Sequence, residues 1–200
     1  MRLPPPGWLG ELASIARGSG ALVCLDEIYT AFGRTGAWFA GPVEGVVPDL
    51  LCVGKALGGG FPLSACIGTP RVMDAWGSSS GEAIHTQTFL GHPVGCAAAL
   101  AVLDVVRTEG LDQRARELGA HLVSAFEQRG YTVRGRGLML GIELPGSLWL
   151  CRTLQRRGYL TLPAGMRAEV LSLTPPASIT IAQLDGFLEA FDEAIADGAR

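Results

Sequence analysis

Three short apolar runs, each followed by a polar or glycine-rich turn, organise the first third of the chain. Residues 21–25, 50–53 and 63–68 have the length and composition of β-strands. The first run leads into Asp26, and the second ends two positions before Lys55. A continuous apolar run is typical of a strand buried on both faces, so we expect these strands inside an α/β layer.

Helical patterns lie between and after these runs. Residues 8–18 form a short amphipathic pattern, and a small-residue helix is expected over 93–103 because Pro93 suits a first helical turn. A longer amphipathic helix over 111–128 is ended by Gly130. The chain therefore starts as an α/β unit.

The pattern changes beyond this helix. Residues 131–144 predict paired strands, 147–157 a helix and 170–173 a strand. A terminal helix is expected to begin at Thr180, whose hydroxyl would form a capping box with Gln183. The sequence thus predicts a small α+β unit at the C-terminal end.

These patterns predict two domains, an α/β domain over 1–129 and a small α+β domain over 130–200. With 48% apolar residues in 200, the chain can bury a substantial core. No internal repeat or low-complexity tract interrupts it.

Composition narrows the possible partners and location. A net charge of −3 without a basic cluster argues against nucleic acid or anionic lipid. No segment has the ~18 uninterrupted apolar residues of a membrane span, and no signal peptide is evident. The cysteines are odd in number and lack metal-ligand spacing, so we expect reduced core residues of a cytoplasmic protein. They are Cys24, Cys52, Cys66, Cys96 and Cys151.

Lysine usage singles out one position. The chain has sixteen basic residues, of which fifteen are Arg, and Lys55 is its one lysine. An arginine-rich coding bias explains the Arg count. Because Arg can replace Lys as a surface charge but not as an amine nucleophile, the remaining lysine is a candidate for covalent chemistry.

Asp26 and Lys55 both stand at the carboxyl ends of predicted strands, where ligands bind in open α/β sheets. From these residues alone, an ordinary ion pair and a catalytic pair are about equally good interpretations. The surrounding motifs are needed to distinguish them.

Three ordered motifs resemble the pyridoxal 5′-phosphate (PLP) signature of class III, fold-type I aminotransferases. They are residues 25–36 (LDEIYTAFGRTG), 48–60 (PDLLCVGKALGGG) and 85–93 (HTQTFLGHP). Residues 135–141 (GRGLMLG) and the Pro175-Pro176 strand end extend the likeness over nearly the whole chain. The resemblance implies the C-terminal portion of a large domain with a mostly parallel sheet, followed by a small α+β domain.

The resemblance also implies a role for four residues. Lys55 would carry PLP as a Schiff base and then move a proton on the substrate. Asp26 would pair with the pyridine nitrogen and keep it protonated, which makes the ring an electron sink. Tyr29 stands where many members have Gln beside the ring hydroxyl, and a phenol can also donate there. Thr88 would reach the cofactor phosphate of a neighbouring subunit, which implies a homodimer.

Other polar residues of the motifs are expected to have structural roles. Glu27 is expected to satisfy local backbone or Arg34, and Arg34 to hold its loop. His85 and His92 are interpreted as hydrogen-bonded spacers, with His92 at a position where the family more often has Asn. Ser172 stands where many members have an Arg that clamps a substrate carboxylate, so another group would have to recognise such a carboxylate.

The family's chains carry a long N-terminal portion that holds part of the cofactor site, and this sequence starts just before the Asp26 strand. We therefore expect a fragment, or a chain completed by a complementary N-terminal half, with exposed apolar sheet edges. Alone, it is expected to bind PLP weakly or not at all.

The resemblance predicts transfer of an amino group from an amine or amino acid donor to a keto acid or aldehyde. Two alternatives remain at this point. One is an aminomutase or racemase of the same fold, which would use the same Lys55 and Asp26. The other is a non-catalytic partner chain of a split or truncated enzyme.

Overall fold

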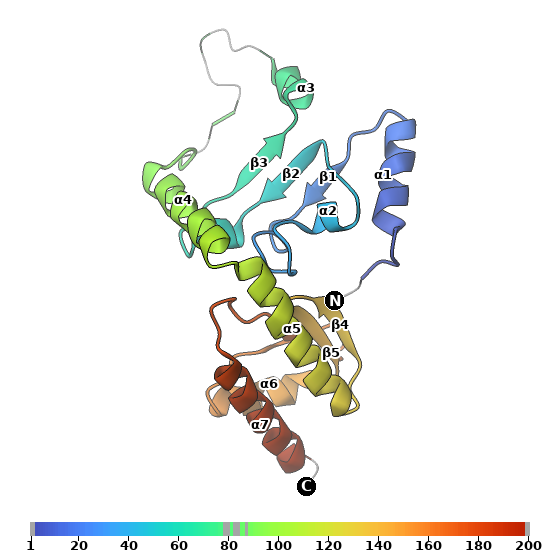
Figure 1. Cartoon of the computed structure of the whole chain (residues 1–200), viewed down its shortest axis with the longest axis vertical. Helices are drawn as coiled ribbons and strands as arrows, with labels where there is room; N and C mark the ends of the chain where they lie inside the picture. The colour runs from blue at the N-terminus through green and yellow to red at the C-terminus, as the bar shows by residue number, and fades with distance from the viewer. Residues whose placement is uncertain (1–2, 78–80, 82–84, 87, 199–200) are drawn as a thin grey trace. The chain divides into compact units, whose positions relative to one another are not determined.

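The chain folds into two compact units, each described separately below. The computed structural model describes residues 3–77, 81, 85–86 and 88–198 (Figure 1). The first unit comprises Pro4–Phe32 and Phe39–Gly110, and the second comprises Met1–Leu3, Gly33–Trp38 and Leu111–Arg200. No described helix is both long and apolar enough to cross a membrane.

The first unit contains a three-stranded sheet in the order β1-β2-β3. Strands β1 and β2 are parallel, whereas β2 and β3 are antiparallel, so the described part of the predicted parallel sheet is mixed. Its elements are α1 (Trp8–Gly18), β1 (Cys24–Asp26), α2 (Ala40–Val43), β2 (Leu50–Val53), η1 (Lys55–Gly58), β3 (Ala65–Gly68), α3 (Pro70–Met73), η2 (Asp74–Trp76) and α4 (Pro93–Thr108).

The prediction that these strands are buried on both faces is wrong for this unit. Leu25 of β1 packs beside a buried cluster of Ala13, Val23 and Val46, so α1 covers the sheet face to which Leu25 belongs. Side chains alternate between the faces of a strand. The neighbouring positions, such as Cys24, therefore lie on the opposite face and are exposed.

The prediction that all five cysteines are core residues is also wrong. Only Cys151 is buried, Cys52 is half-buried, and the other three are exposed, namely Cys24, Cys66 and Cys96. The apolar context predicted burial, but the short strands place their cysteines on the face that α1 does not cover.

The second unit is a four-stranded antiparallel sheet in the order β4-β5-β7-β6. The elements confirm the predicted order, and edge strand β6 is an addition that the sequence pattern did not indicate. They are α5 (Leu111–Gln128), β4 (Val133–Arg136), β5 (Met139–Glu143), α6 (Ser147–Arg156), β6 (Leu162–Ala164), β7 (Val170–Leu173) and α7 (Ile181–Gly198).

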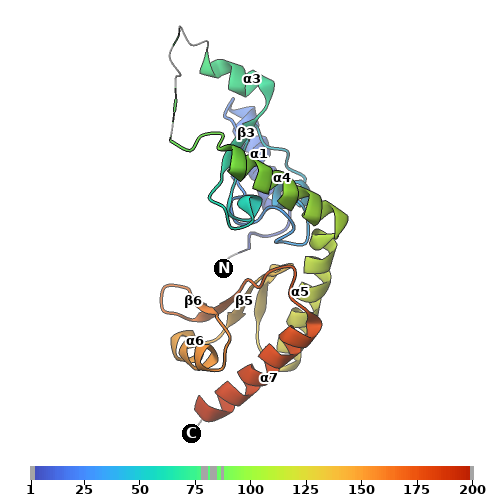
Figure 2. The same cartoon turned by 90° about the vertical axis from the view of Figure 1, so that its left-hand side faces the viewer.

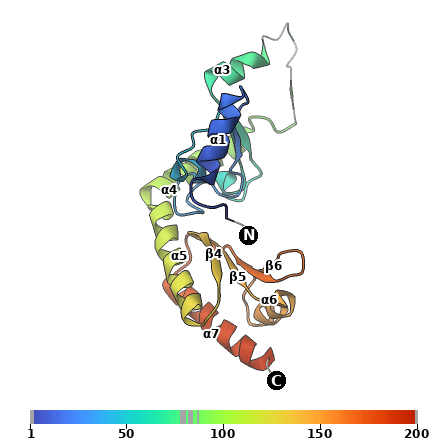
Figure 3. The ribbon, with the colours of Figure 1, turned by 90° about the vertical axis from the view of Figure 1, so that its right-hand side faces the viewer.

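The core of the second unit lies between one face of this sheet and helices α5, α6 and α7 (Figures 2 and 3). Aromatic rings form its centre. Phe191 is fully buried and meets Phe126 edge-on, with ring centroids 5.0 Å apart, and Tyr131 at 5.4 Å. Phe187 extends the cluster toward Tyr159, with centroids 5.6 Å apart.

The predicted capping box of the terminal helix is confirmed. The backbone N–H of Gln183 donates to Thr180 Oγ1 at 3.2 Å, and the backbone N–H of Thr180 donates to Gln183 Oε1 at 2.9 Å. These bonds satisfy two of the amide groups that a helix start leaves without intrahelical partners.

The compact units divide between Gly110 and Leu111, which is earlier than the domain boundary predicted at 129/130. The difference is helix α5. Its buried side chains, including Leu118, Leu122 and Phe126, belong to the core of the second unit. An amphipathic pattern identifies such a helix but not the sheet against which its apolar face packs.

Truncation of Phe191 tests this core. Phe191→Ala should lower the free energy of unfolding of the second unit by about 3–5 kcal/mol, because it removes a fully buried ring and leaves a cavity. Urea unfolding followed by circular dichroism measures the change. Ile181→Ala, at an exposed position of the same helix, is the control. Equal midpoints for the two variants would contradict the assigned core.

Candidate active site

The neighbouring strands β1 and β2 run parallel (Figure 1). Their carboxyl ends bring Asp26 and Lys55 to the same edge of the sheet. Asp26 is the last residue of β1 and pairs in register with Cys52 of β2. β2 ends at Val53, and Lys55 begins the short helix η1. Parallel strands direct their carboxyl ends to one edge, so the amine and the carboxylate share the position where α/β sheets bind ligands.

The backbone at Lys55 is strained. Its φ angle is +42°, in the left-handed region that favours glycine. Such a conformation costs of order 1 kcal/mol or more for a residue with a side chain. A glycine would adopt this conformation without the strain, but it would bring no amine to the strand end.

Tyr29 lies against the lysine amine. The Nζ atom of Lys55 is 4.8 Å from the centroid of the Tyr29 ring, which is within the range of a cation–π contact. The turn after β1 thus brings the phenol to the amine that follows β2. The family resemblance implies that Lys55 and Tyr29 bind the same ligand, and the structure shows that their side chains are in contact.

The Asp26 carboxylate is exposed and oriented by its own turn. Its Oδ1 accepts a hydrogen bond from the backbone N–H of Ile28 at 2.9 Å. This bond fixes the side chain at the end of the strand, facing away from the buried cluster beneath α1.

Glu27, the next residue, is buried and structural. It is 3% exposed, and its Oε2 accepts from the backbone N–H of Ala40 at 2.7 Å and from the hydroxyl of Thr30 at 2.9 Å. Its Oε1 accepts from the backbone N–H of Gly41 at 2.8 Å. The prediction that Glu27 satisfies local backbone is confirmed, and the carboxylate ties the turn after β1 to the start of α2.

The predicted loop role of Arg34 is also confirmed. Within the second unit its guanidinium donates to the backbone carbonyls of Leu138 at 3.1 Å and Pro175 at 2.5 Å. Gly137 lies so close to this loop that a Cβ there would meet the backbone nitrogen of Gly36 at 2.5 Å. Arg34 is therefore held by the turn between β4 and β5.

The residues of the third motif lie just before α4. Thr88 is exposed, in the turn that leads to the helix. His92 caps the helix, because its Nδ1 accepts from the backbone N–H of Gly95 at 3.3 Å, and this agrees with the spacer role expected for it. His85 packs edge-on against Trp76, with ring centroids 6.3 Å apart.

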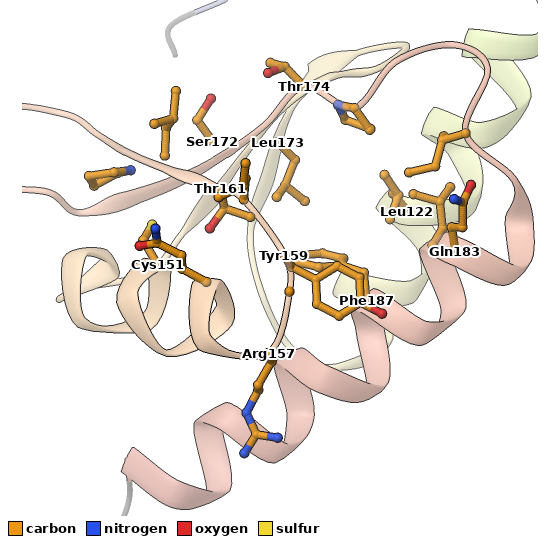
Figure 4. Close-up of a pocket in the computed structure, with 18 of the residues that line it drawn as sticks. Leu122, Cys151, Arg157, Tyr159, Thr161, Ser172, Leu173, Thr174, Gln183 and Phe187 are labelled. Atoms are coloured by element: carbon orange, nitrogen blue, oxygen red, sulfur yellow. The ribbon is translucent and has the colours of Figure 1, made fainter.

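A separate pocket of about 1020 Å³ lies in the second unit, near α6, α7 and the loop that leads to β6 (Figure 4). Ser172 is among its lining residues, as are Tyr159, Phe187 and Thr161, and the Thr161 hydroxyl is buried without a hydrogen-bond partner in the described structure. No residue of the three signature motifs lines this pocket. The residues that line this pocket therefore do not include Asp26 or Lys55.

Ser172 lies on the sheet face opposite the core of the second unit. Its neighbours Leu171 and Leu173 are buried core residues, so Ser172 points the other way. In register it pairs with Gly141 of β5 and Leu162 of β6. Neither partner brings a positive charge to this position.

The chain belongs to the class-III aminotransferase family, because the sequence model of "Aminotransferase class-III" matches residues 1–195. Acetylornithine aminotransferase of Mycobacterium tuberculosis (strain ATCC 25618 / H37Rv) is 42% identical over 194 residues, which cover 94% of this chain and 47% of the relative. That of Methanothermobacter thermautotrophicus is 36% identical over 203 residues, covering 98% and 50%. The chain thus spans about half the length of these curated relatives.

Solved structures confirm the fold-type I prediction. Acetylornithine aminotransferase from Elizabethkingia anophelis is similar with a TM-score of 0.87 and 35% identity, covering 98% of this chain and 53% of that one. An amine transaminase from an uncultivated Pseudomonas species, in a PLP-bound form, gives 0.86 and 31%, covering 98% and 49%. All of these relatives are aminotransferases or transaminases, so the comparisons do not favour the mutase, racemase or non-catalytic alternatives.

Class III aminotransferases are PLP-dependent, and the residues at the strand ends fit this cofactor. An aldehyde needs an amine, a pyridinium nitrogen needs an anion, and a ring hydroxyl needs a hydrogen-bonding partner. Lys55 carries an amine, Asp26 a carboxylate and Tyr29 a phenol within one unit, and Nζ of Lys55 is in contact with the ring of Tyr29.

Replacing the buried carboxylate tests the architecture beneath this site. Glu27→Gln should lower the free energy of unfolding by about 1–3 kcal/mol, because one carboxylate oxygen that accepts from a backbone N–H becomes an amide donor. Chemical denaturation measures the change. Glu109→Gln, at an exposed position of the same unit, is the matched control. An unchanged stability for Glu27→Gln would show that the three hydrogen bonds do not hold the turn.

Proposed function

We propose that this chain is the lysine-bearing portion of a PLP-dependent aminotransferase that moves an amino group from an amine or amino acid to a keto acid or aldehyde. One observation carries the proposal, namely that Lys55 and Asp26 occupy the carboxyl ends of adjacent parallel strands. Family membership over nearly the whole chain supports it.

Each residue of the site has a chemical task in this proposal. PLP, when bound, supplies the electron sink for the reaction. Nζ of Lys55 would hold the cofactor through its aldehyde group and would act as the base that moves a proton at the substrate carbon. The Asp26 carboxylate would keep a proton on the ring nitrogen, and the Tyr29 hydroxyl would donate a hydrogen bond to the ring oxygen. Thr88 binds the phosphate in a neighbouring subunit.

The amino donor is an amine or an amino acid whose carboxylate is recognised away from Ser172. The relatives named above act on acetylornithine and on amines, so both donor types occur among similar proteins. A serine hydroxyl can hydrogen-bond a carboxylate but brings no charge to it. This chemistry would take place in the cytoplasm, in keeping with unpaired cysteine thiols.

We also propose that a second copy of the chain covers the start of α4, with a complementary N-terminal half as the alternative occupant. Phe89 and Leu90, which follow Thr88, are 69% and 63% exposed, and Leu100 of α4 is 70% exposed. Large exposed apolar patches mark interaction surfaces. A subunit placed there would lie next to Thr88, as the sharing of a phosphate requires.

Borohydride trapping tests the cofactor role of Lys55. We expect the isolated chain to bind PLP weakly. Borohydride reduces the bond between PLP and the lysine, and the label then stays on the protein. Because Lys55 is the one lysine, a phosphopyridoxyl group on a side chain must appear on the tryptic peptide that spans residues 35–71, since trypsin no longer cleaves after the modified lysine. Mass spectrometry detects it. Lys55→Arg keeps the charge and should abolish this labelling.

A second pair of variants distinguishes a binding site from a merely reactive amine. Asp26→Asn should raise the PLP concentration for half-maximal labelling by about tenfold or more, since a charge-assisted hydrogen bond of about 1.5–3 kcal/mol is lost. Asp74→Asn, at an exposed position of the same unit, should leave it unchanged. Equal labelling of both variants and of urea-unfolded chain would refute the site.

Sedimentation equilibrium tests the proposed subunit contact. Leu100→Glu should raise the dissociation constant for self-association by about tenfold or more, because a charge would be buried in an apolar contact. Leu160→Glu changes an exposed leucine of the other unit, 85% exposed, and should have no effect. A wild-type chain that stays monomeric, or equal constants for both variants, would rule out this surface.

A further inference from the structure

Three cysteines lie side by side across the sheet of the first unit. Cys52 is at the centre, on β2, with Cys66 directly opposite it on β3 and Cys24 on β1. The sulfur atoms of Cys24 and Cys52 are 4.0 Å apart. Directly paired residues share a face, as do residues two apart on one strand, so all three thiols point to the face that α1 leaves uncovered. We call Cys24, Cys52 and Cys66 the thiol face.

The pairing geometry selects one pair for a disulfide. Residues directly opposite in an antiparallel ladder have Cα atoms about 4.5–5.5 Å apart, which is within the Cα range of disulfides, so Cys52 and Cys66 are the pair placed for a bridge. Cys24 is in register with Leu50 rather than with Cys52. A two-residue offset on neighbouring strands places their Cα atoms about 8 Å apart, which is too far for a relaxed bridge.

The thiol face is also open to small oxidants. Cys24 and Cys66 are exposed and Cys52 is half-buried. The pKa of the Cys24 thiol and that of the Cys66 thiol are both raised. Partial removal from solvent is the larger cause, and the interaction with the neighbouring Cys52 is the second. Thiolate is the reacting form, so oxidation should speed up in mildly alkaline buffer.

We propose that Cys52 and Cys66 form a reversible disulfide when the chain meets a peroxide. One thiolate attacks a peroxide oxygen, the O–O bond breaks, and the departing hydroxide takes up a proton, which leaves a sulfenic acid. The other thiolate attacks that sulfur, the S–S bond forms, and the oxygen leaves as water. Two thiols and one hydrogen peroxide thus give one disulfide and two waters, and a dithiol reductant reverses the change.

The bridge would join β3 to the strand that leads to Lys55. Cys52 stands three residues before Lys55 and is the register partner of Asp26. Oxidation would therefore constrain the strand end that carries the amine. Formation of the disulfide requires no cofactor. A chain that does not form it can therefore still bind PLP, and a chain that does not bind PLP can still form it.

Peptide mapping tests the bridge on the 200-residue chain. The tryptic cleavage sites at Arg34, Lys55 and Arg71 put Cys24, Cys52 and Cys66 on different peptides. After treatment with hydrogen peroxide and alkylation, we expect one cross-linked pair joining residues 35–55 to residues 56–71. The pair should disappear on treatment with dithiothreitol.

Variants and unfolding provide the controls. Cys52→Ser and Cys66→Ser should each abolish the 52–66 pair, whereas Cys96→Ser, which removes an exposed cysteine of α4, should keep it. Circular dichroism of the reduced variants verifies that they fold. In urea, cross-links should spread among all five cysteines. A dominant Cys24–Cys52 pair, cross-links only between chains, or oxidation without an intrachain bridge would each overturn the proposal.

Discussion

Asp26, at the end of β1, pairs in register with Cys52 of β2, and Lys55 follows three positions later. This parallel pairing is the constraint on which the site depends. It places a carboxylate and an amine from segments 29 residues apart at one edge of the sheet. A change of register by one residue would turn one of the two side chains to the opposite face. The aminotransferase chemistry proposed here therefore rests on backbone hydrogen bonds between two short strands.

Two charged residues of the first motif have structural roles, one in each unit. Glu27 binds two backbone amides at the start of α2, directly beside Asp26 in sequence. Arg34 binds two backbone carbonyls in the second unit. Asp26 and Glu27 are adjacent in the motif but differ in burial, and this difference distinguishes the structural residue from the candidate site residue. Glu27 is buried with its acceptors satisfied, whereas the Asp26 carboxylate is exposed.

The two units differ in how their apolar surface is covered. The second unit buries an aromatic cluster between its sheet and three helices. In the first unit, α1 covers one sheet face, and the thiol face remains exposed in the described structure. The open face exposes Cys24 and Cys66, and the pairing of the strands places them beside Cys52. The same apolar sequence can be core or surface, depending on what packs against it.

The sequence by itself determined the family, the order of elements and the candidate residues. Ordered motifs around Asp26 and Lys55 are specific, and the helices over 8–18 and 111–128 follow from periodicity. Local chemistry also determined the Thr180 capping box, because its partners are three residues apart.

Only the tertiary structure decided which residues become neighbours. The contact of Lys55 with Tyr29, the strained backbone at Lys55 and the assignment of α5 to the second core depend on packing between distant segments. The burial of the cysteines and the antiparallel pairing of β3 were decided in the same way. Periodicity tells which face of an element is apolar, but the partner of that face is fixed by long-range packing.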